Sequence, residues 1–199
     1  MITFSSWPNL PCENAYLSLY HRALAGYGIR LGPPCEIQDA FLRANAGRIN
    51  AIHIQWAPEQ IWRCRGSSAW ARARGLAGFW KYLRLARSLG IRVIWTLHDV
   101  EHHEGSGRLD EFGYRLLARR ADLCIVHDEW AAEQFVQRFG GARERVCVME
   151  HGNYDGVFPT AAPRAGTLAK FGIDPARRVL LCQGNIRPYK RFDLAIEAV

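Results

Sequence analysis

Histidine and acidic side chains follow several segments of the sequence that are typical of buried strands. His98 and Asp99 come directly after the apolar, β-branched run "IRVIWTL". His127 follows "DLCIV", and His151 and Asn153 follow "RVCVM". An imidazole exchanges protons near neutral pH and forms hydrogen bonds in both directions, so these residues suit acid–base or substrate-binding chemistry.

The carboxyl ends of parallel strands meet at one edge of a sheet, and ligands bind in the crevice outside that edge. We therefore expect the strand-end residues to come together there. His98 is the candidate catalytic residue, because it follows the most strand-like segment. Asp128 is expected to cap the helix that it precedes. The candidate cleft-lining residues are Asn14, Asp99, His127, His151 and Asn153.

The stretch "TLHDVEHHE" also raises a metal-dependent alternative. His98, Asp99, His102 and His103 are ligand types that metal ions bind, and a site made of them would suit a metal-dependent hydrolase. The sequence has no H-E-x-x-H signature or comparable ligand spacing. We therefore assign no metal ligand, and the hydrolase stays an alternative.

The segment "GNIRPYKRF" has the order of a glycine-led turn followed by a helix. Gly184 lets the backbone approach a ligand closely, and the start of a helix presents free N–H groups to an anion. Arg187 and Lys190 add two positive charges, so we predict a phosphate-binding turn. The segment is neither a Walker A nor a G-x-G-x-x-G motif, so an exposed basic turn is the alternative.

Strand-like and helix-like segments alternate along most of the sequence. This alternation predicts an α/β fold with a doubly wound parallel sheet and helices on both faces. The expected strands are residues 2–7, 29–31, 51–56, 91–97, 122–126 and 145–149. The expected helices are residues 15–25, 37–46, 69–89, 109–120 and 129–139.

The composition changes after the last of these strands. We predict a Rossmann-like N-terminal domain over residues 1–160 and a linker with one short helix over residues 161–177. Residues 178–199 are expected to be the incomplete start of a second α/β domain, with a strand at "RVLLCQG" and a helix at "KRFDLAIEAV". One strand and one helix cannot bury a core by themselves.

Lysine and arginine outnumber aspartate and glutamate by 26 to 19, and the net charge of +7 favours an anionic partner. The predicted helix 69–89 is basic and aromatic, with Trp70, Arg74, Lys81 and Arg84 on its outward face. Such a face suits an anionic membrane surface. A plain solvated helix exterior is the alternative, and a nucleic-acid partner is not expected.

The cellular location is inferred from features that the sequence lacks. The N-terminal stretch "MITFSSWPNLPCEN" has no signal-peptide pattern, and no apolar run reaches the ~18 residues that span a bilayer. The six cysteines form no C-x-x-C pair, which fits reduced thiols. We therefore expect a cytoplasmic protein that is peripheral on the inner face of the cell membrane.

Taken in order, five segments resemble family-4-type glycosyltransferases with the GT-B fold, in which two Rossmann-like domains face each other across a cleft. The segments are "AIHIQWAPE", "IRVIWTLHD", "ADLCIVHDEWAAEQF", "RVCVMEHGNYDGVFP" and "LLCQGNIRPYKRFDLAIEA". Each is a weak match alone, and their order and spacing carry the resemblance.

The resemblance implies transfer of a sugar from a UDP-, GDP- or ADP-sugar to a lipid-linked or polysaccharide acceptor, without a further cofactor. It implies that Gly184, Arg187 and Lys190 bind the donor diphosphate. It also implies that His98 contacts the transferred sugar or the acceptor near the reacting carbon.

The sequence departs from the family pattern in two places. The family's glycine-rich loop after the first strand is replaced by "SSWPNLPCEN". The family's C-terminal pair of glutamates, eight residues apart, would lie beyond Val199, so we expect an incomplete and inactive fragment. A non-catalytic module that binds anions through the basic helix and the terminal turn is the alternative from another functional class.

Overall fold

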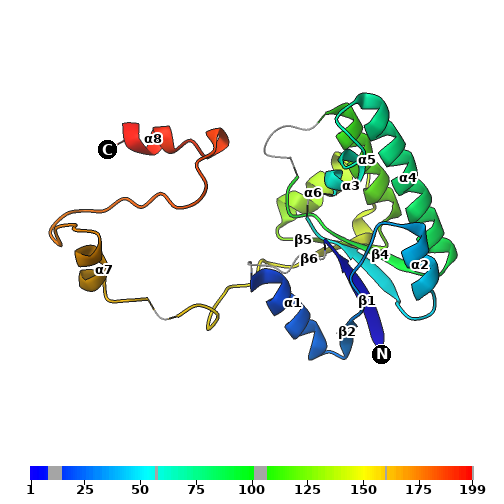
Figure 1. The fold of residues 1–199 in the computed structure, drawn as a ribbon, viewed down its shortest axis with the longest axis horizontal. Helices are drawn as coiled ribbons and strands as arrows, with labels where there is room; N and C mark the ends of the chain where they lie inside the picture. Colours follow the sequence, from blue (N-terminus) through cyan, green and yellow to red (C-terminus); the bar gives the residue numbers. More distant parts are fainter. Residues whose placement is uncertain (9–14, 57, 101–106, 160, 199) are drawn as a thin grey trace. The chain divides into compact units, whose positions relative to one another are not determined.

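The computed structural model describes residues 1–8, 15–56, 58–100, 107–159 and 161–198. Most of them form a parallel α/β sheet domain, which confirms the predicted fold class (Figure 1). The chain divides into two compact units, Met1–Asn153 and Tyr154–Val199.

All neighbouring strands of the sheet run parallel, in the order β2-β1-β3-β4-β5-β6. The chain first crosses from β1 to β2 and then returns past β1 to β3, so the strand order reverses beside β1. Ligands bind α/β sheets outside such a reversal, at the carboxyl ends of the strands. The strands are β1 (Ile2–Trp7), β2 (Ile29–Leu31), β3 (Ala51–Ile54), β4 (Arg92–Thr96), β5 (Leu123–Val126) and β6 (Val146–Val148).

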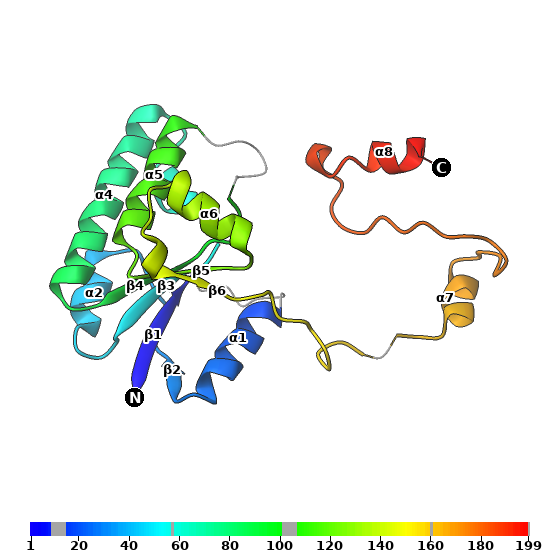
Figure 2. The same cartoon turned by 180° about the vertical axis from the view of Figure 1, so that it is seen from behind.

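Helix α1 covers one face of the sheet, and α2, α4 and α5 lie on the other (Figures 1 and 2). Right-handed crossovers that run in opposite directions along a sheet place their helices on opposite faces. The sequence did not predict the short α3. The helices of this unit are α1 (Ala15–Ala25), α2 (Asp39–Asn45), α3 (Glu59–Arg63), α4 (Ala69–Ser88), α5 (Arg108–Arg120) and α6 (Glu129–Gln137), with a 3-10 turn η1 at Arg143–Arg145.

The main apolar core lies between the sheet and α4, α5 and α6. The predicted inward face of α4 is confirmed, since Leu76, Phe79, Leu83 and Ala86 are all buried. Across from them, Trp95 of β4 is almost completely buried among aromatic rings of α5 and α6. Within the described part of the chain, every helix is too short or too polar to cross a bilayer.

Asp110, near the start of α5, joins that helix to α3. Its carboxylate accepts hydrogen bonds from Trp62 Nε1 at 2.9 Å, from Arg63 Nη2 at 2.7 Å and from the Gly107 backbone N–H at 3.1 Å. Burial acts to raise the pKa of this carboxyl, but hydrogen bonds from Arg63, Trp62 and Gly107 outweigh it and lower the pKa to about 2. The buried carboxylate is therefore ionised and fully paired.

The fully buried Trp62 is packed between two glycines. A Cβ atom on Gly113 of α5 would lie 2.5 Å from Cζ2 of the Trp62 ring, and one on Gly75 of α4 would overlap the Trp62 carbonyl oxygen. The absence of side chains at these positions lets α4 and α5 approach α3. This packing fixes the helices behind β3 and β4.

The second unit contains α7 (Arg164–Lys170), a 3-10 turn η2 (Pro188–Lys190) and α8 (Phe192–Glu197). The strand predicted at residues 178–184 is wrong, because the described residues of this unit contain no strand. A strand needs a neighbour to pair its backbone groups, and none is present in these residues. The boundaries 1–160, 161–177 and 178–199 stay predictions.

The tight packing of Trp62 predicts opposite effects for alanine at two helical glycines. Gly113→Ala should lower the free energy of unfolding by about 1–3 kcal/mol, because the new methyl group overlaps the indole. Gly78→Ala on α4 meets open space and should be neutral or stabilise by up to about 1 kcal/mol. Urea unfolding of both variants measures the difference, and equal effects would contradict the packing described.

Candidate active site at the carboxyl edge of the sheet

Polar side chains line one face of the sheet where β3 and β4 end. His53 and Gln55 are two residues apart, and so are Thr96 and His98 on the neighbouring strand. Side chains alternate across a strand, so each pair points to the same face, the one covered by α1. His53 and Gln55 are completely buried, and Thr96 is 1% exposed.

These four side chains are hydrogen-bonded in a row. His53 Nε2 lies 2.8 Å from Thr96 Oγ1, and His53 Nδ1 lies 3.2 Å from Gln55 Nε2. The amide oxygen of Gln55 lies 3.2 Å from His98 Nε2. A buried polar group without a partner costs about 1–3 kcal/mol, so each member of the row stabilises the next.

His98 connects this row to the ends of β5 and β6. Its Nδ1 lies 3.3 Å from His127 Nε2, and His127 Nδ1 lies 2.9 Å from the Met149 carbonyl oxygen. The ring of His151 lies 5.2 Å from the ring of His127, centroid to centroid. The structure therefore brings the three predicted histidines together at the carboxyl edge, while their roles stay predictions.

Two larger aromatic rings pack against the histidines. Trp56 is stacked on His98, with ring centroids 4.9 Å apart and planes inclined by 16°. Tyr16 of α1 meets His98 edge-on at 5.2 Å and lies 5.1 Å from His151. We refer to Tyr16, Trp56, His98, His127 and His151 as the histidine–aromatic cluster.

Burial keeps His53 and His98 uncharged near neutral pH. Burial lowers the pKa of His98 to about 3, helped by His127 and His151. Burial, His21 and His98 likewise lower the pKa of His53 to about 3. A neutral imidazole has one N–H donor and one lone pair, so it can position a hydroxyl group or accept its proton.

The other predicted cleft residues have different surroundings. Asp99 is exposed. Burial raises the pKa of the Tyr114 phenol on α5, followed by Glu59, and the charge of Asp99 adds to this rise. Asn153 is exposed at the end of the first unit. Asn14 lies outside the described residues. The predicted helix cap is confirmed, because Asp128 Oδ1 accepts a hydrogen bond from the backbone of the next helix at 2.7 Å.

Two of the four residues of the metal-dependent alternative, His102 and His103, lie outside the described residues. Among the residues that the structure does describe, no three histidine, cysteine, aspartate or glutamate side chains are grouped to hold a metal ion.

The predicted phosphate-binding turn lies in the second unit. Gly184 has a φ of 120°, which favours glycine, and a Cβ atom there would lie 2.6 Å from Lys190 Nζ. The Lys190 ammonium therefore lies directly over the Gly184 backbone. The backbone N–H of Lys190 donates to the Arg187 carbonyl oxygen at 3.0 Å. The three predicted residues belong to one local turn, and their binding of phosphate stays a prediction.

Sequence reasoning missed four residues of this site: Tyr16, His53, Gln55 and Thr96. Three of them had a usable signal, because "HIQ" and "TLH" each place two polar residues on one face of an otherwise apolar strand. Tyr16 is 82 positions from His98, so their contact depends on where α1 packs.

The comparisons with known proteins match the part of the chain that carries the histidines. Residues 73–152 match the model of Glycosyltransferase Family 4. The resemblance to family-4-type glycosyltransferases is confirmed. His98, His127 and His151 all lie inside the segment that matches family 4.

Two known proteins are similar to parts of this chain. A D-inositol 3-phosphate glycosyltransferase of Streptomyces bingchenggensis (strain BCW-1) is 31% identical over 87 residues, which are 44% of this chain and 19% of that protein. The crystal structure of Anabaena Alr3699/HepE in complex with UDP has a TM-score of 0.50 and 16% identity, over 86% of this chain and 50% of that one. The second likeness concerns the fold alone, and the chain spans about half the length of that structure.

The low pKa values of His53 and His98 predict that acid destabilises the fold. Below about pH 6.5 these histidines take up protons in the unfolded chain, whereas in the native state they stay neutral down to about pH 3. The free energy of unfolding should therefore fall by about 1.4 kcal/mol per pH unit for each of them across this window.

Urea unfolding at several pH values between 7 and 5 measures this slope. His98→Gln should remove the contribution of one proton and so reduce the slope. A stability that does not change with pH over this range would contradict the buried, neutral histidines.

Proposed function

We propose that this chain forms the acceptor side of a glycosyltransferase that moves a sugar from a nucleotide sugar to a lipid-linked or saccharide acceptor. The observation that carries the proposal is the meeting of His98, His127 and His151 at the carboxyl edge, inside the segment that matches family 4. Ligand crevices of parallel sheets lie at this edge.

The histidine–aromatic cluster has the chemistry that an acceptor site needs. In glycosyl transfer the acceptor hydroxyl forms a bond to the anomeric carbon and loses its proton, while the bond from that carbon to the diphosphate breaks. Trp56 and Tyr16 offer apolar ring surface to the C–H groups of a sugar or lipid. His98, whose ring packs against both of them, is the residue that we assign to the reacting centre.

On the donor side, we propose that Gly184, Arg187 and Lys190 hold the diphosphate. The bare backbone at Gly184 admits a phosphate oxygen, and the ammonium of Lys190 already lies over it. Arg187 supplies a second cation at the start of η2. Positive groups stabilise the charge that develops on the departing diphosphate, a role that a metal ion fills in other transferases.

We further propose that the 199 residues alone do not turn over a nucleotide sugar. Among the described residues of the second unit, Leu168 is the one buried apolar side chain, and no strand is formed. The diphosphate contacts therefore have no core of their own to hold them in place. The base of the donor, whether uracil, guanine or adenine, is left open by the residues described.

The donor proposal predicts weak binding of nucleoside diphosphates at the terminal turn. Titration of the labelled chain with UDP, GDP and ADP should shift the backbone NMR signals of residues 184–190. Lys190→Gln should weaken this binding about tenfold or more, because a hydrogen bond to a charged group contributes about 1.5–3 kcal/mol. Lys170→Gln on α7 is the charge-matched control and should have little effect.

Two outcomes would go against this assignment. Shifts spread over the basic face of α4, with none at residues 184–190, would favour the non-catalytic anion-binding module. Equal loss of binding in the Lys190 and Lys170 variants would mean that the net charge of the chain, and not this turn, accounts for the binding.

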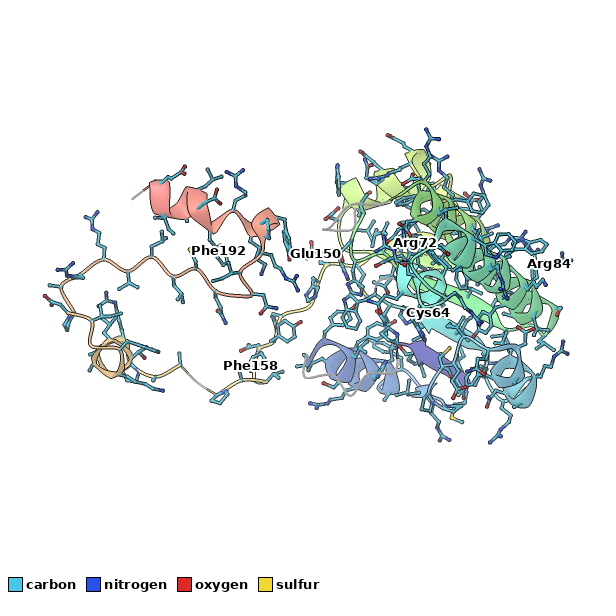
Figure 3. All side chains as sticks on the ribbon, turned by 45° about the horizontal axis from the view of Figure 1, so that its top comes forward. Cys64, Arg72, Arg84, Glu150, Phe158 and Phe192 are labelled. Atoms are coloured by element: carbon cyan, nitrogen blue, oxygen red, sulfur yellow. The ribbon has the colours of Figure 1, made fainter. Side chains whose placement is uncertain are left out.

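We also propose that the outward face of α4 rests on an anionic membrane at its cytoplasmic side. Trp70 is 72% exposed, and Arg74, Lys81 and Arg84 are exposed beside it. Figure 3 shows Arg84 at the outer side of α4, and its guanidinium carbon lies 4.7 Å from the centroid of the Trp80 ring. Aromatic and basic side chains on one helix face favour the interface of an anionic bilayer.

Two cavities beside this face fit the same partner. One has a volume of about 880 Å³ and lies among α2, α3 and α4, and the other has about 560 Å³. Arg65, Gly78 and Lys81 line both of them, so a basic hollow opens where α4 has no side chain. A phosphate headgroup that enters the hollow would gain two cationic contacts.

The membrane proposal predicts selective binding to anionic vesicles. Sedimentation with phosphatidylcholine vesicles should recover little protein, and addition of phosphatidylglycerol should recover most of it. Trp70→Ala should weaken the binding about tenfold, because burial of a large apolar side chain contributes about 1.5–3 kcal/mol. Trp130→Ala, at an exposed tryptophan of α6, is the matched control. Equal binding to both vesicle types would contradict the proposal.

A further inference from the structure

One end of the hydrogen-bonded row has a fixed direction. The Met149 carbonyl oxygen accepts hydrogen bonds and cannot donate, so His127 Nδ1, 2.9 Å away, must carry the hydrogen. In a neutral ring the other nitrogen then has the lone pair. His127 Nε2 is therefore an acceptor, and it faces His98 Nδ1 at 3.3 Å.

While the rings are neutral, the donor and acceptor of this one hydrogen bond determine the donor and acceptor of every other bond in the row. His98 Nδ1 donates to His127, so His98 Nε2 is an acceptor and needs a donor. The facing group is the Gln55 amide, which must turn its NH₂ group toward His98 at 3.2 Å. The two ends of an amide have nearly the same shape, so the hydrogen-bond partners decide its orientation.

The orientation of the Gln55 amide also decides which atoms donate and accept at His53 and Thr96. With its NH₂ on His98, the amide end that lies 3.2 Å from His53 Nδ1 becomes the oxygen instead of the nitrogen, and it accepts a hydrogen bond from His53. His53 Nε2 is then free to accept from the Thr96 hydroxyl at 2.8 Å. Every donor meets an acceptor from Thr96 to Met149, and His53, His98 and His127 all carry their hydrogen on Nδ1.

The opposite amide orientation, with Oε1 at 3.2 Å from His98 Nε2, needs one more proton. His98 Nε2 then donates to Gln55, while His127 Nδ1 still donates to Met149. Two neutral rings would now point lone pairs at each other across the 3.3 Å gap. One proton between His98 and His127 removes that conflict, so this orientation belongs to a protonated pair.

We propose that Gln55 is a positioning residue that passes the tautomer of His98 on to His53 and turns over when the His98–His127 pair takes up a proton. The turn exchanges the donor and acceptor ends of the amide and moves the hydrogen of His53 from Nδ1 to Nε2, onto the Thr96 hydroxyl. In both states each ring nitrogen of His53, His98 and His127 that belongs to the row faces a complementary donor or acceptor. The inference deepens the proposed function, since it describes how the same site holds a proton.

The titratable groups around His98 and His127 influence how readily these two rings take up a proton. The titratable side chains that face it are Tyr16 from α1, His53 from β3 and His151 after β6. In the described part of the chain, no carboxylate is hydrogen-bonded to His98 or His127. With no carboxylate hydrogen-bonded to it, His98 is neutral near neutral pH, which agrees with its low pKa.

The test uses NMR of the ligand-free chain with ¹⁵N-labelled histidine, where long-range couplings show which ring nitrogen carries the hydrogen. At pH 7 His53, His98 and His127 should all show hydrogen on Nδ1, although free histidine favours Nε2. Signals are assigned with single histidine-to-glutamine variants. A hydrogen on Nε2 of neutral His98 at pH 7 would overturn the proposal.

A charge variant gives a second readout. A carboxylate at position 55 can only accept, so Gln55→Glu requires His53 Nδ1 and His98 Nε2 both to donate, which makes His98 an imidazolium. The pKa of His98 should rise by about 1–3 units. Gln137→Glu, at an exposed glutamine of α6, adds the same charge and should leave it unchanged.

An unchanged pKa in Gln55→Glu, or an equal rise in both variants, would overturn the proposal. Both readouts are taken without any sugar donor. Failure of the proposed transferase activity would therefore leave them intact, and their failure would leave the transferase proposal to its own tests.

Discussion

Burial of polar side chains at the ends of β3 and β4 is the constraint on which this site depends. Gln55 and His53 are completely removed from water, so each of their hydrogens and lone pairs needs a partner inside the protein. The available partners are one another, the Thr96 hydroxyl and His98. The orientation of His98 is therefore set by its hydrogen bond to a buried side chain at the end of β3.

The opposite face of the sheet supplies the rigidity that such a site needs. There the Asp110 carboxylate joins α3 to α5 through Trp62 and Arg63, and glycines on α4 and α5 let the helices close over the indole. A shift of these helices would move β3 and β4, and with them the hydrogen-bonded row. One face of the sheet is thus packed for stability, and the other carries groups that exchange protons.

Much of this arrangement could be predicted from the sequence, because it depends on short-range patterns. The alternation of strands and helices and the histidines after strands are visible in the residue order, and the structure agrees with both. The roles of Tyr16 and Trp56 could not be predicted, because they depend on where α1 packs across the sheet. The strand expected at 178–184 failed for a related reason, since a strand forms against a neighbour and its own residues do not supply one.

The central claim is that the histidine–aromatic cluster lies where a sugar is transferred, and transfer itself tests it most directly. The measurement is the movement of a labelled sugar from UDP-, GDP- and ADP-sugars to lipid and saccharide acceptors, by these 199 residues joined to a complete nucleotide-sugar-binding domain. The account predicts transfer that falls by about a hundredfold or more in His98→Gln, with binding of the nucleotide retained. Transfer at an unchanged rate in that variant would contradict it.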